Sequence, residues 1–91
     1  MKVSENVFKA ILNPVRLQIL SCLNKQDLSV NNIISKCGLS QSAVSQHLKI
    51  LKDFDLVECR KEGREVTYKI INGKAGRIAD LVFTLNKEDK K

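Results

Sequence analysis

Residues 38–51 read GLSQSAVSQHLKIL, the start of a helix placed directly after a glycine that can end another helix. Ser40 is of a type that caps helix N-termini, and Gly38 favours the left-handed conformation found just beyond a helix. A helix is predicted from about Gln41 to Phe54. The residues that recur there at helical spacing are Ala43, Val44, His47, Leu48 and Leu51. Two helices joined by a short turn containing glycine are typical of a helix-turn-helix.

Three helices are expected upstream of this segment. Ser4 can cap the first, whose apolar face holds Val7, Phe8, Ile11 and Leu12. Asn13 and Pro14 suit the cap and first position of a second helix that ends near Leu23. Its inward residues are Val15, Ile19, Leu20 and Leu23. Either Asp27 or Ser29 can cap a third, which ends at Gly38 and holds Val30, Ile33, Ile34 and Cys37.

Downstream, the apolar period changes from 3.6 to 2. Residues 56–61 and 65–71 alternate about a turn at 62–64, which predicts a β-hairpin. Its inner face is expected to hold Val57, Cys59, Val66, Tyr68 and Ile70, and its outer face Glu58, Arg60, Lys61, Arg64 and Lys69. A last helix begins near Lys74 and precedes a polar run from Asn86 to Lys91. Its apolar residues are Ile78, Ala79, Leu81, Val82 and Leu85.

The predicted fold class is mainly α with a small β-hairpin (α+β), in the order four helices, two strands and one helix. This order defines a winged helix-turn-helix. With 91 residues the chain fits one domain, residues 1–91, and so small a domain gains stability from a partner subunit. We expect a homodimer formed by the two terminal helices, whose apolar faces need covering. The expected interface residues are Val7, Phe8, Ile11, Ile78, Leu81, Val82 and Leu85.

The 16 Lys and Arg residues outnumber the 10 Asp and Glu residues, and the resulting charge of +6 favours a polyanionic partner. The N-terminus, Met1 to Asn6, lacks the continuous apolar stretch of a signal peptide, and no run is long enough to span a membrane. We therefore expect a cytoplasmic protein that binds double-stranded DNA and no membrane.

The DNA-binding residues are predicted on the fourth helix and the hairpin. Ser and Gln side chains can hydrogen-bond to base edges or phosphates, and long basic side chains on the hairpin can reach the backbone or minor groove. Arg64 has the leading hairpin role, and Lys61 contacts phosphate without sequence preference. His47 either faces DNA or packs within the turn. The candidates are Ser40, Gln41, Ser42, Ser45, Gln46, His47, Lys49, Arg60, Lys61 and Arg64.

No pattern of catalytic or cofactor-binding residues is evident. Cys22, Cys37 and Cys59 lie far apart without a CxxC pair, and His47 is the single histidine, so neither a zinc-finger spacing nor a disulfide framework is indicated. The cysteines are interpreted as reduced, partly buried residues, with a redox switch as the alternative. We expect no enzyme activity, metal site or cofactor.

Residues 39–51 closely resemble the recognition helix of the ArsR (SmtB/ArsR) family of bacterial and archaeal repressors. The resemblance extends to residues 12–20, which are similar to the family's second helix, and to residues 56–68, similar to its wing. It covers roughly residues 5 to 85. It implies a dimer that binds an inverted-repeat operator and blocks transcription until an effector releases it.

The effector sites of the family are where the sequence departs from the resemblance. Metal-sensing members carry a Cys-x-Cys motif at the start of the third helix, but Ser29 and Asn31 stand here. Other members bind metal on the last helix, which offers no histidine. A third group senses oxidants through one cysteine in the second helix and one in the last; Cys22 matches the first, and the second is missing, so a thiol switch would need Cys37, Cys59 or a bond between subunits.

Two other functions remain open at this point. A winged-helix protein-interaction module could use the same surface, although it would more comfortably show an apolar patch there. An architectural protein that coats DNA without sequence preference would bind unrelated duplexes equally. A sequence-specific repressor is the prediction that the polar helix and basic hairpin favour.

Overall fold

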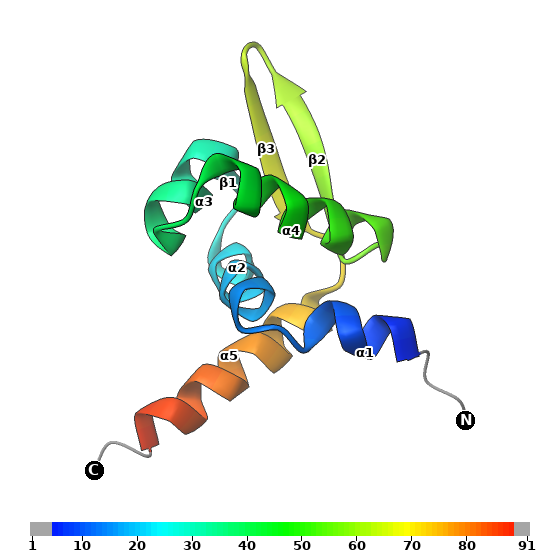
Figure 1. Ribbon diagram of the computed structural model, residues 1–91, viewed down its shortest axis with the longest axis vertical. Coiled ribbons are helices and arrows are strands. Elements are labelled where there is room, and N and C mark those ends of the chain that lie inside the picture. The colour runs from blue at the N-terminus through cyan, green and yellow to red at the C-terminus, as the bar shows by residue number, and fades with distance from the viewer. Residues whose placement is uncertain (1–4, 89–91) are drawn as a thin grey trace.

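The computed structural model describes residues 5–88, with side chains described for residues 8–85. Its elements are α1 (Glu5–Ile11), α2 (Pro14–Lys25), β1 (Leu28–Ser29), α3 (Val30–Cys37), α4 (Gln41–Asp53), β2 (Val57–Glu62), β3 (Glu65–Ile70) and α5 (Gly73–Glu88) (Figure 1). The predicted fold class is confirmed, and the five helices and the hairpin follow one another in the predicted order. The sequence did not predict β1, which makes the sheet three-stranded.

Side-chain caps fix where three of the helices begin. Asn13 Oδ1 accepts hydrogen bonds from the backbone N–H groups of Val15, at 2.9 Å, and Arg16, at 3.1 Å. Ser40 Oγ accepts from the N–H of Ala43 at 3.1 Å at the start of α4. Ser29, rather than Asp27, caps α3. Ser4, the predicted cap of α1, lies outside the described residues.

The turn of the helix-turn-helix is formed as predicted. Gly38 has φ 66° and ψ 31°, and its N–H donates to the carbonyl of Ile34 at 2.9 Å, which ends α3. Residues with a Cβ rarely adopt this left-handed conformation, so glycine is the natural choice at this position. Only Leu39 and Ser40 separate Gly38 from α4, so α3 and α4 pack directly on one another.

The sheet is antiparallel in the order β1-β3-β2. Cys59 pairs with Tyr68 across β2 and β3, so one face of the hairpin carries the predicted inner residues, all of which are buried or half-buried. β1 pairs Leu28 with Tyr68 and Ser29 with Thr67. A two-residue strand has no alternation to read in the sequence, and only its pairing with β3 creates it.

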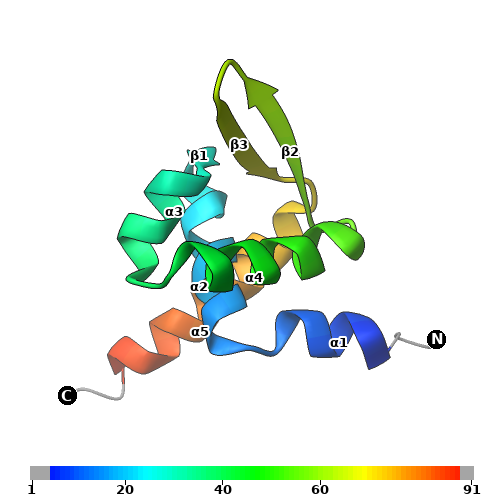
Figure 2. The same cartoon turned by 45° about the horizontal axis from the view of Figure 1, so that its top comes forward.

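The core lies around α2, which is surrounded by α3, α4, the sheet and α5 (Figure 2). Val15, predicted to face inward, is half-buried and packs against the core, and Leu17, which the sequence did not place inward, is buried. Ala79 of α5 is fully buried against this core. The largest fully buried side chains are Ile19, Leu20, Ile33, Val44, Leu48, Leu51 and Val57. Within residues 5–88, no helix combines the length and hydropathy needed to cross a membrane.

Candidate nucleic-acid interface

The outward face of α4 is polar and exposed, and no other helix or strand within residues 5–88 covers it (Figure 2). Its C-terminal half buries Leu48 and Leu51, which turns the polar residues of the same helix toward solvent. Ser40 is exposed, although its hydroxyl oxygen already accepts the capping hydrogen bond. The exposed candidates on α4 are Gln41, Ser42, Ser45, Gln46 and Lys49.

A cleft of about 390 Å³ joins α4 to the hairpin. Gln41 and Ser45 line it from α4, Arg64 lines it from the hairpin, and Asn31 lines it from the start of α3. Three predicted candidates from two separate segments, Gln41 and Ser45 of α4 and Arg64 of the hairpin, therefore meet at one site. The amides and hydroxyl supply donors and acceptors that suit base edges and phosphate oxygens. The guanidinium of Arg64 supplies positive charge beside the carboxylate of Glu65, which also lines the cleft.

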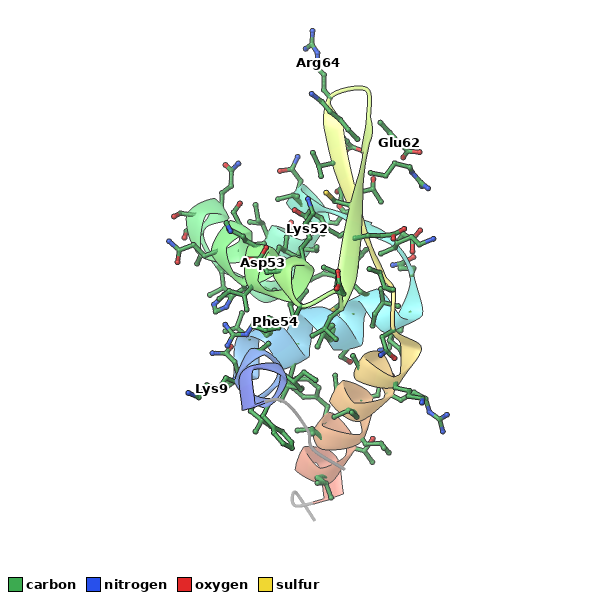
Figure 3. The ribbon with its side chains drawn as sticks, turned by 90° about the vertical axis from the view of Figure 1, so that its right-hand side faces the viewer. Lys9, Lys52, Asp53, Phe54, Glu62 and Arg64 are labelled. Carbon is green, nitrogen blue, oxygen red and sulfur yellow. The ribbon has the colours of Figure 1, made fainter. Side chains whose placement is uncertain are left out.

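The hairpin extends away from the body of the domain, and Arg64 projects from its tip (Figure 3). Arg60 lies on the exposed face of β2 and pairs with Glu62 there, with 3.2 Å between Nε and Oε2. Lys61 is exposed on the opposite face, the face that carries Cys59. The sequence analysis placed Lys61 on the outer face with Arg60, and that prediction is wrong, because Lys61 pairs with Val66 on the inner face. Val66 and Arg64 both line the cleft beside α4.

Two of the candidate cations carry exposed ion pairs. Lys49 pairs with Asp53 one helical turn later, at 3.2 Å, and Arg60 pairs with Glu62. Exposed pairs of this kind contribute little, about 0–1 kcal/mol. Phosphates can therefore displace the carboxylates at small cost, and the pairs do not remove these cations from the interface.

His47 is half-buried in α4 and faces Arg16 of α2, with 3.2 Å between its Nδ1 and the Arg16 Nη1. Burial, and then the charge of Arg16, lowers the pKa of His47 below its ordinary value. The ring is therefore held neutral near pH 7. The structure supports packing within the helix-turn-helix for this residue.

The predicted dimer surface is strongly apolar. On α5, Leu81 is 64% exposed and Leu85 60% exposed, and Ile78 and Val82 are also exposed; Phe8 of α1 is 51% exposed. Ile11 packs in part against the domain's own core, and the side chain of Val7 lies outside the described ones. Leucines this open in water on one helix indicate a surface that is covered in the functional assembly.

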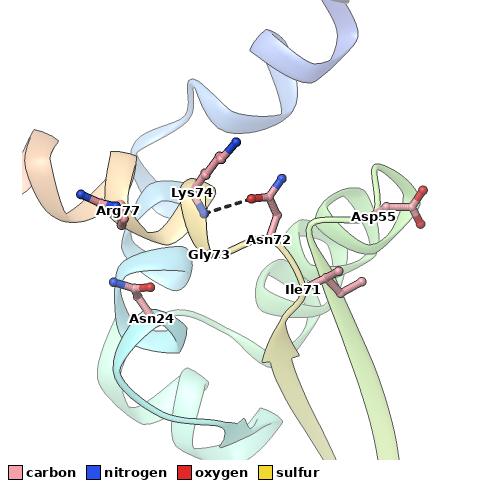
Figure 4. Close-up of a pocket in the computed structure, with 7 residues that line it drawn as sticks. All are labelled: Asn24, Asp55, Ile71, Asn72, Gly73, Lys74 and Arg77. Carbon is pink, nitrogen blue, oxygen red and sulfur yellow. Dashed lines mark hydrogen bonds between the residues drawn. The ribbon is translucent and has the colours of Figure 1, made fainter.

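Other cavities lie away from α4. An apolar one of about 350 Å³ separates the α1–α2 corner from α5 and is lined by Leu12, Asn13, Pro14, Leu17, Val82 and Phe83. A polar one of about 630 Å³ lies at the start of α5, where Asn72 Oδ1 accepts from the N–H of Lys74 at 2.9 Å (Figure 4). None of the predicted DNA-binding residues lines either cavity.

Comparison with known proteins fits this geometry. A sequence profile described as bacterial regulatory protein, arsR family, matches residues 13–58, from the N-cap of α2 into β2. The chain belongs to the arsR family. The matched region contains the whole helix-turn-helix, so the ArsR-family resemblance predicted from residues 39–51 is confirmed.

The chain is similar to ArsR-family regulators along most of its length. The transcriptional activator HlyU of Vibrio cholerae is 40% identical over 79 residues, 87% of this chain and 73% of that protein. The biofilm growth-associated repressor of Xylella fastidiosa is 28% identical over 80 residues, 88% of this chain and 70% of that protein. The first is named a transcriptional activator and the second a repressor.

Solved structures show the same winged helix-turn-helix. The structure of Vibrio cholerae HlyU superposes with a TM-score of 0.78, at 40% identity, over 88% of this chain and 87% of that one. A homodimeric winged helix-turn-helix DNA-binding domain of Mycobacterium bovis, Mb0332, has a TM-score of 0.76 at 34% identity, over 92% of this chain and 78% of that one.

The cysteines of this ArsR-family chain are all free and half-buried. Burial, and then the charge of Cys22, raises the pKa of Cys37 above its ordinary value, so Cys37 carries little thiolate at neutral pH. Cys59 lies beside Tyr68, whose pKa is raised by burial and by that cysteine. Within the described residues, no group of three His, Cys, Asp or Glu side chains is arranged to hold a metal ion.

Sequence reasoning missed three contacts that the structure shows, two at α4 or its cleft and one between α2 and α5. Asn31 lines the cleft between α4 and the hairpin, yet nothing in the sequence distinguishes it from a surface residue of α3. Arg16 contacts His47 across 31 residues of sequence. Asp80 of α5 accepts hydrogen bonds from Ser21 Oγ and, at 2.8 Å, from Asn24 Nδ2, both on α2, which lowers the pKa of its carboxyl.

Proposed function

We propose that this ArsR-family chain is a sequence-specific DNA-binding regulator that inserts α4 into the major groove and places its hairpin along the adjacent backbone. The observation that carries the proposal is the cleft shared by Gln41 and Ser45 of α4 and Arg64 of the hairpin. One surface thus presents both base-reading and phosphate-binding groups. Residues 1–91 act as a single domain in this proposal.

The base-reading residues are Gln41, Ser45 and Gln46, with Ser40 and Ser42 near the helix N-terminus. Free N–H groups and the positive dipole end of α4 favour a phosphate there. Glutamine amides can pair with adenine edges, and serine hydroxyls with bases or phosphates. Lys49, Lys61 and Arg64 neutralise phosphates on either side. This division assigns specificity to α4 and sequence-independent affinity to the cations.

The regulator acts as a homodimer in this proposal, with α1 and α5 as the interface. Support comes from the exposed leucines of α5 and from the Mb0332 domain, which is described as homodimeric. A twofold dimer presents two copies of α4 and matches an inverted repeat. Binding to such an operator blocks transcription, as the name of the Xylella fastidiosa relative suggests, whereas HlyU is named an activator.

The metal-sensing cysteine pair of the family is not part of this proposal. Ser29 stands at one of its positions, and its hydroxyl oxygen caps α3 by accepting from Asn32 N–H at 3.2 Å. A thiol-sensing repressor that uses Cys22, Cys37 or Cys59 is the alternative, and the raised pKa of Cys37 disfavours that residue as the reactive one. A protein-interaction module is a second alternative, against which the polar surface of α4 argues.

The test compares Gln46→Ala with Lys61→Ala on the operator and on an unrelated duplex. Gln46→Ala is expected to lose about 1–3 kcal/mol on the operator and to relax preference at one base position. Lys61→Ala is expected to weaken binding to both duplexes alike and to reduce the salt dependence of the binding constant by about one released counterion. Equal losses for Gln46→Ala on both duplexes would remove the base-reading role.

A further inference from the structure

Arg16 makes an unusual set of contacts for a residue in the first turn of α2. Its Nε donates to the carbonyl of Ala10 at 2.6 Å, and its Nη2 donates to the carbonyl of Lys9 at 2.8 Å. Its Nη1 lies 3.2 Å from His47 Nδ1. One half-buried guanidinium therefore joins the C-terminal end of α1 to the middle of α4.

The α1 side of this contact supplies a helix end that needs a partner. The last carbonyls of a helix have no N–H donor within the helix. In α1, the carbonyls of Lys9 and Ala10 accept hydrogen bonds from the guanidinium of Arg16 instead. With seven residues, α1 is too short to be stable alone. Its main contacts are with α2 and α4. Arg16 thus helps to fix where α1 sits, together with the buried Ala10.

The α4 side fixes the protonation of a histidine. Arginine can only donate, so Nδ1 of His47 must accept and therefore carries no proton. A neutral ring must then hold its proton on Nε2. The contact selects one tautomer and one ring orientation in the middle of the helix that carries Gln46.

We propose that Arg16 is a positioning residue that locks the DNA-reading helix α4 to the dimer helix α1, so that the placement of α4 depends on how α1 is seated. The inference rests on the proposed function, because it takes α4 as the DNA-reading element. Lysine cannot replace arginine here, because a single ammonium group cannot reach three acceptors that a planar fork spans.

The first test is spectroscopic and needs no DNA. His47 is the only histidine, so long-range ¹H–¹⁵N NMR of the ring reports this site alone. We expect a single Nε2–H tautomer in the wild type and a mixture of tautomers in Arg16→Lys. The matched control Arg77→Lys changes an exposed arginine of α5 and is expected to leave the tautomer unchanged. An Nδ1–H ring in the wild type would overturn the proposal, and this result does not depend on whether Arg16→Lys folds.

The second test measures the ratio of operator to random-duplex affinity, at protein concentrations where sedimentation shows each variant to be fully dimeric. Arg16→Lys is expected to lower this ratio by about fivefold or more, in the range of coupling between sites. Arg77→Lys is expected to stay within about twofold of wild type. A ratio for Arg16→Lys equal to that of Arg77→Lys would overturn the positioning role.

A double-mutant cycle with His47→Phe separates the Arg16–His47 link from any contact that His47 itself makes with DNA. Once the acceptor is gone, Arg16→Lys should lower the ratio by much less than it does in the wild type. Fully additive losses would contradict the link. A wild type that selects no operator refutes the proposed function and this inference together, whereas selection by an unaffected Arg16→Lys refutes this inference alone.

Discussion

Leu81 offers the most direct test of the dimer surface, because its side chain is 64% exposed on α5 of the single chain. Fully burying a leucine side chain stabilises by about 1.5–3 kcal/mol, so covering the exposed part of Leu81 is worth ~1–2 kcal/mol. Twofold symmetry counts it twice, which gives ~2–4 kcal/mol per dimer. We therefore expect Leu81→Ala to raise the dimer dissociation constant by about 30-fold or more.

Sedimentation equilibrium over a wide concentration range measures this change, and far-UV circular dichroism checks that the monomer stays folded. Ile71→Ala is the matched control, since Ile71 is 49% exposed but lies by the polar cavity at the start of α5 (Figure 4). Its dissociation constant should equal that of the wild type. The same dissociation constant for Leu81→Ala and Ile71→Ala would refute the assignment of this face.

Three further predictions follow from shifted pKa values. The pKa of His47 is lowered on folding, so stability is intact above about pH 6.5 and declines as pH falls toward the lowered folded value. Measured by urea unfolding, the free energy of unfolding should fall less between about pH 7.5 and pH 5 in His47→Phe than in the wild type. An identical fall in both proteins would contradict this. The lowered pKa of Asp80 makes its carboxylate stabilising above its ordinary value of 3.8, with the contribution lost as pH falls through the folded value. Asp80→Asn should therefore lower the melting temperature near pH 6 and much less near about pH 3; a constant difference would count against the hydrogen bonds from Ser21 and Asn24. The raised pKa of Cys37 predicts slower alkylation by iodoacetamide at about pH 8 in the folded chain than in urea. Mass spectrometry of the Cys37 peptide measures both rates, and equal rates would contradict the prediction.

The parts of the fold that could be predicted depend on local chemistry. Asn13 and Ser40 cap helices because their own side chains reach backbone N–H groups two or three residues away. Gly38 ends α3 through its own φ. Such signals lie within a few residues of one another, so the sequence alone displays them.

The parts that escaped prediction depend on contacts between distant segments. β1 exists only because Leu28 and Ser29 pair with β3, some 40 positions along the chain. The contact of Arg16 with His47 and the acceptance by Asp80 of hydrogen bonds from α2 follow from how the helices pack. An exposed serine or glutamine on α4 was predictable from helical period, whereas its meeting with Arg64 in one cleft was not.

The measurement that bears most directly on DNA reading is selection from a pool of random duplexes with the reduced protein at moderate salt, followed by sequencing of what is retained. The proposed function predicts enrichment of one inverted repeat, with half-sites spaced by about one helical turn. Retention without enrichment would indicate a protein that coats DNA without reading it. Failure to retain any duplex would contradict DNA binding and favour a protein-interaction module.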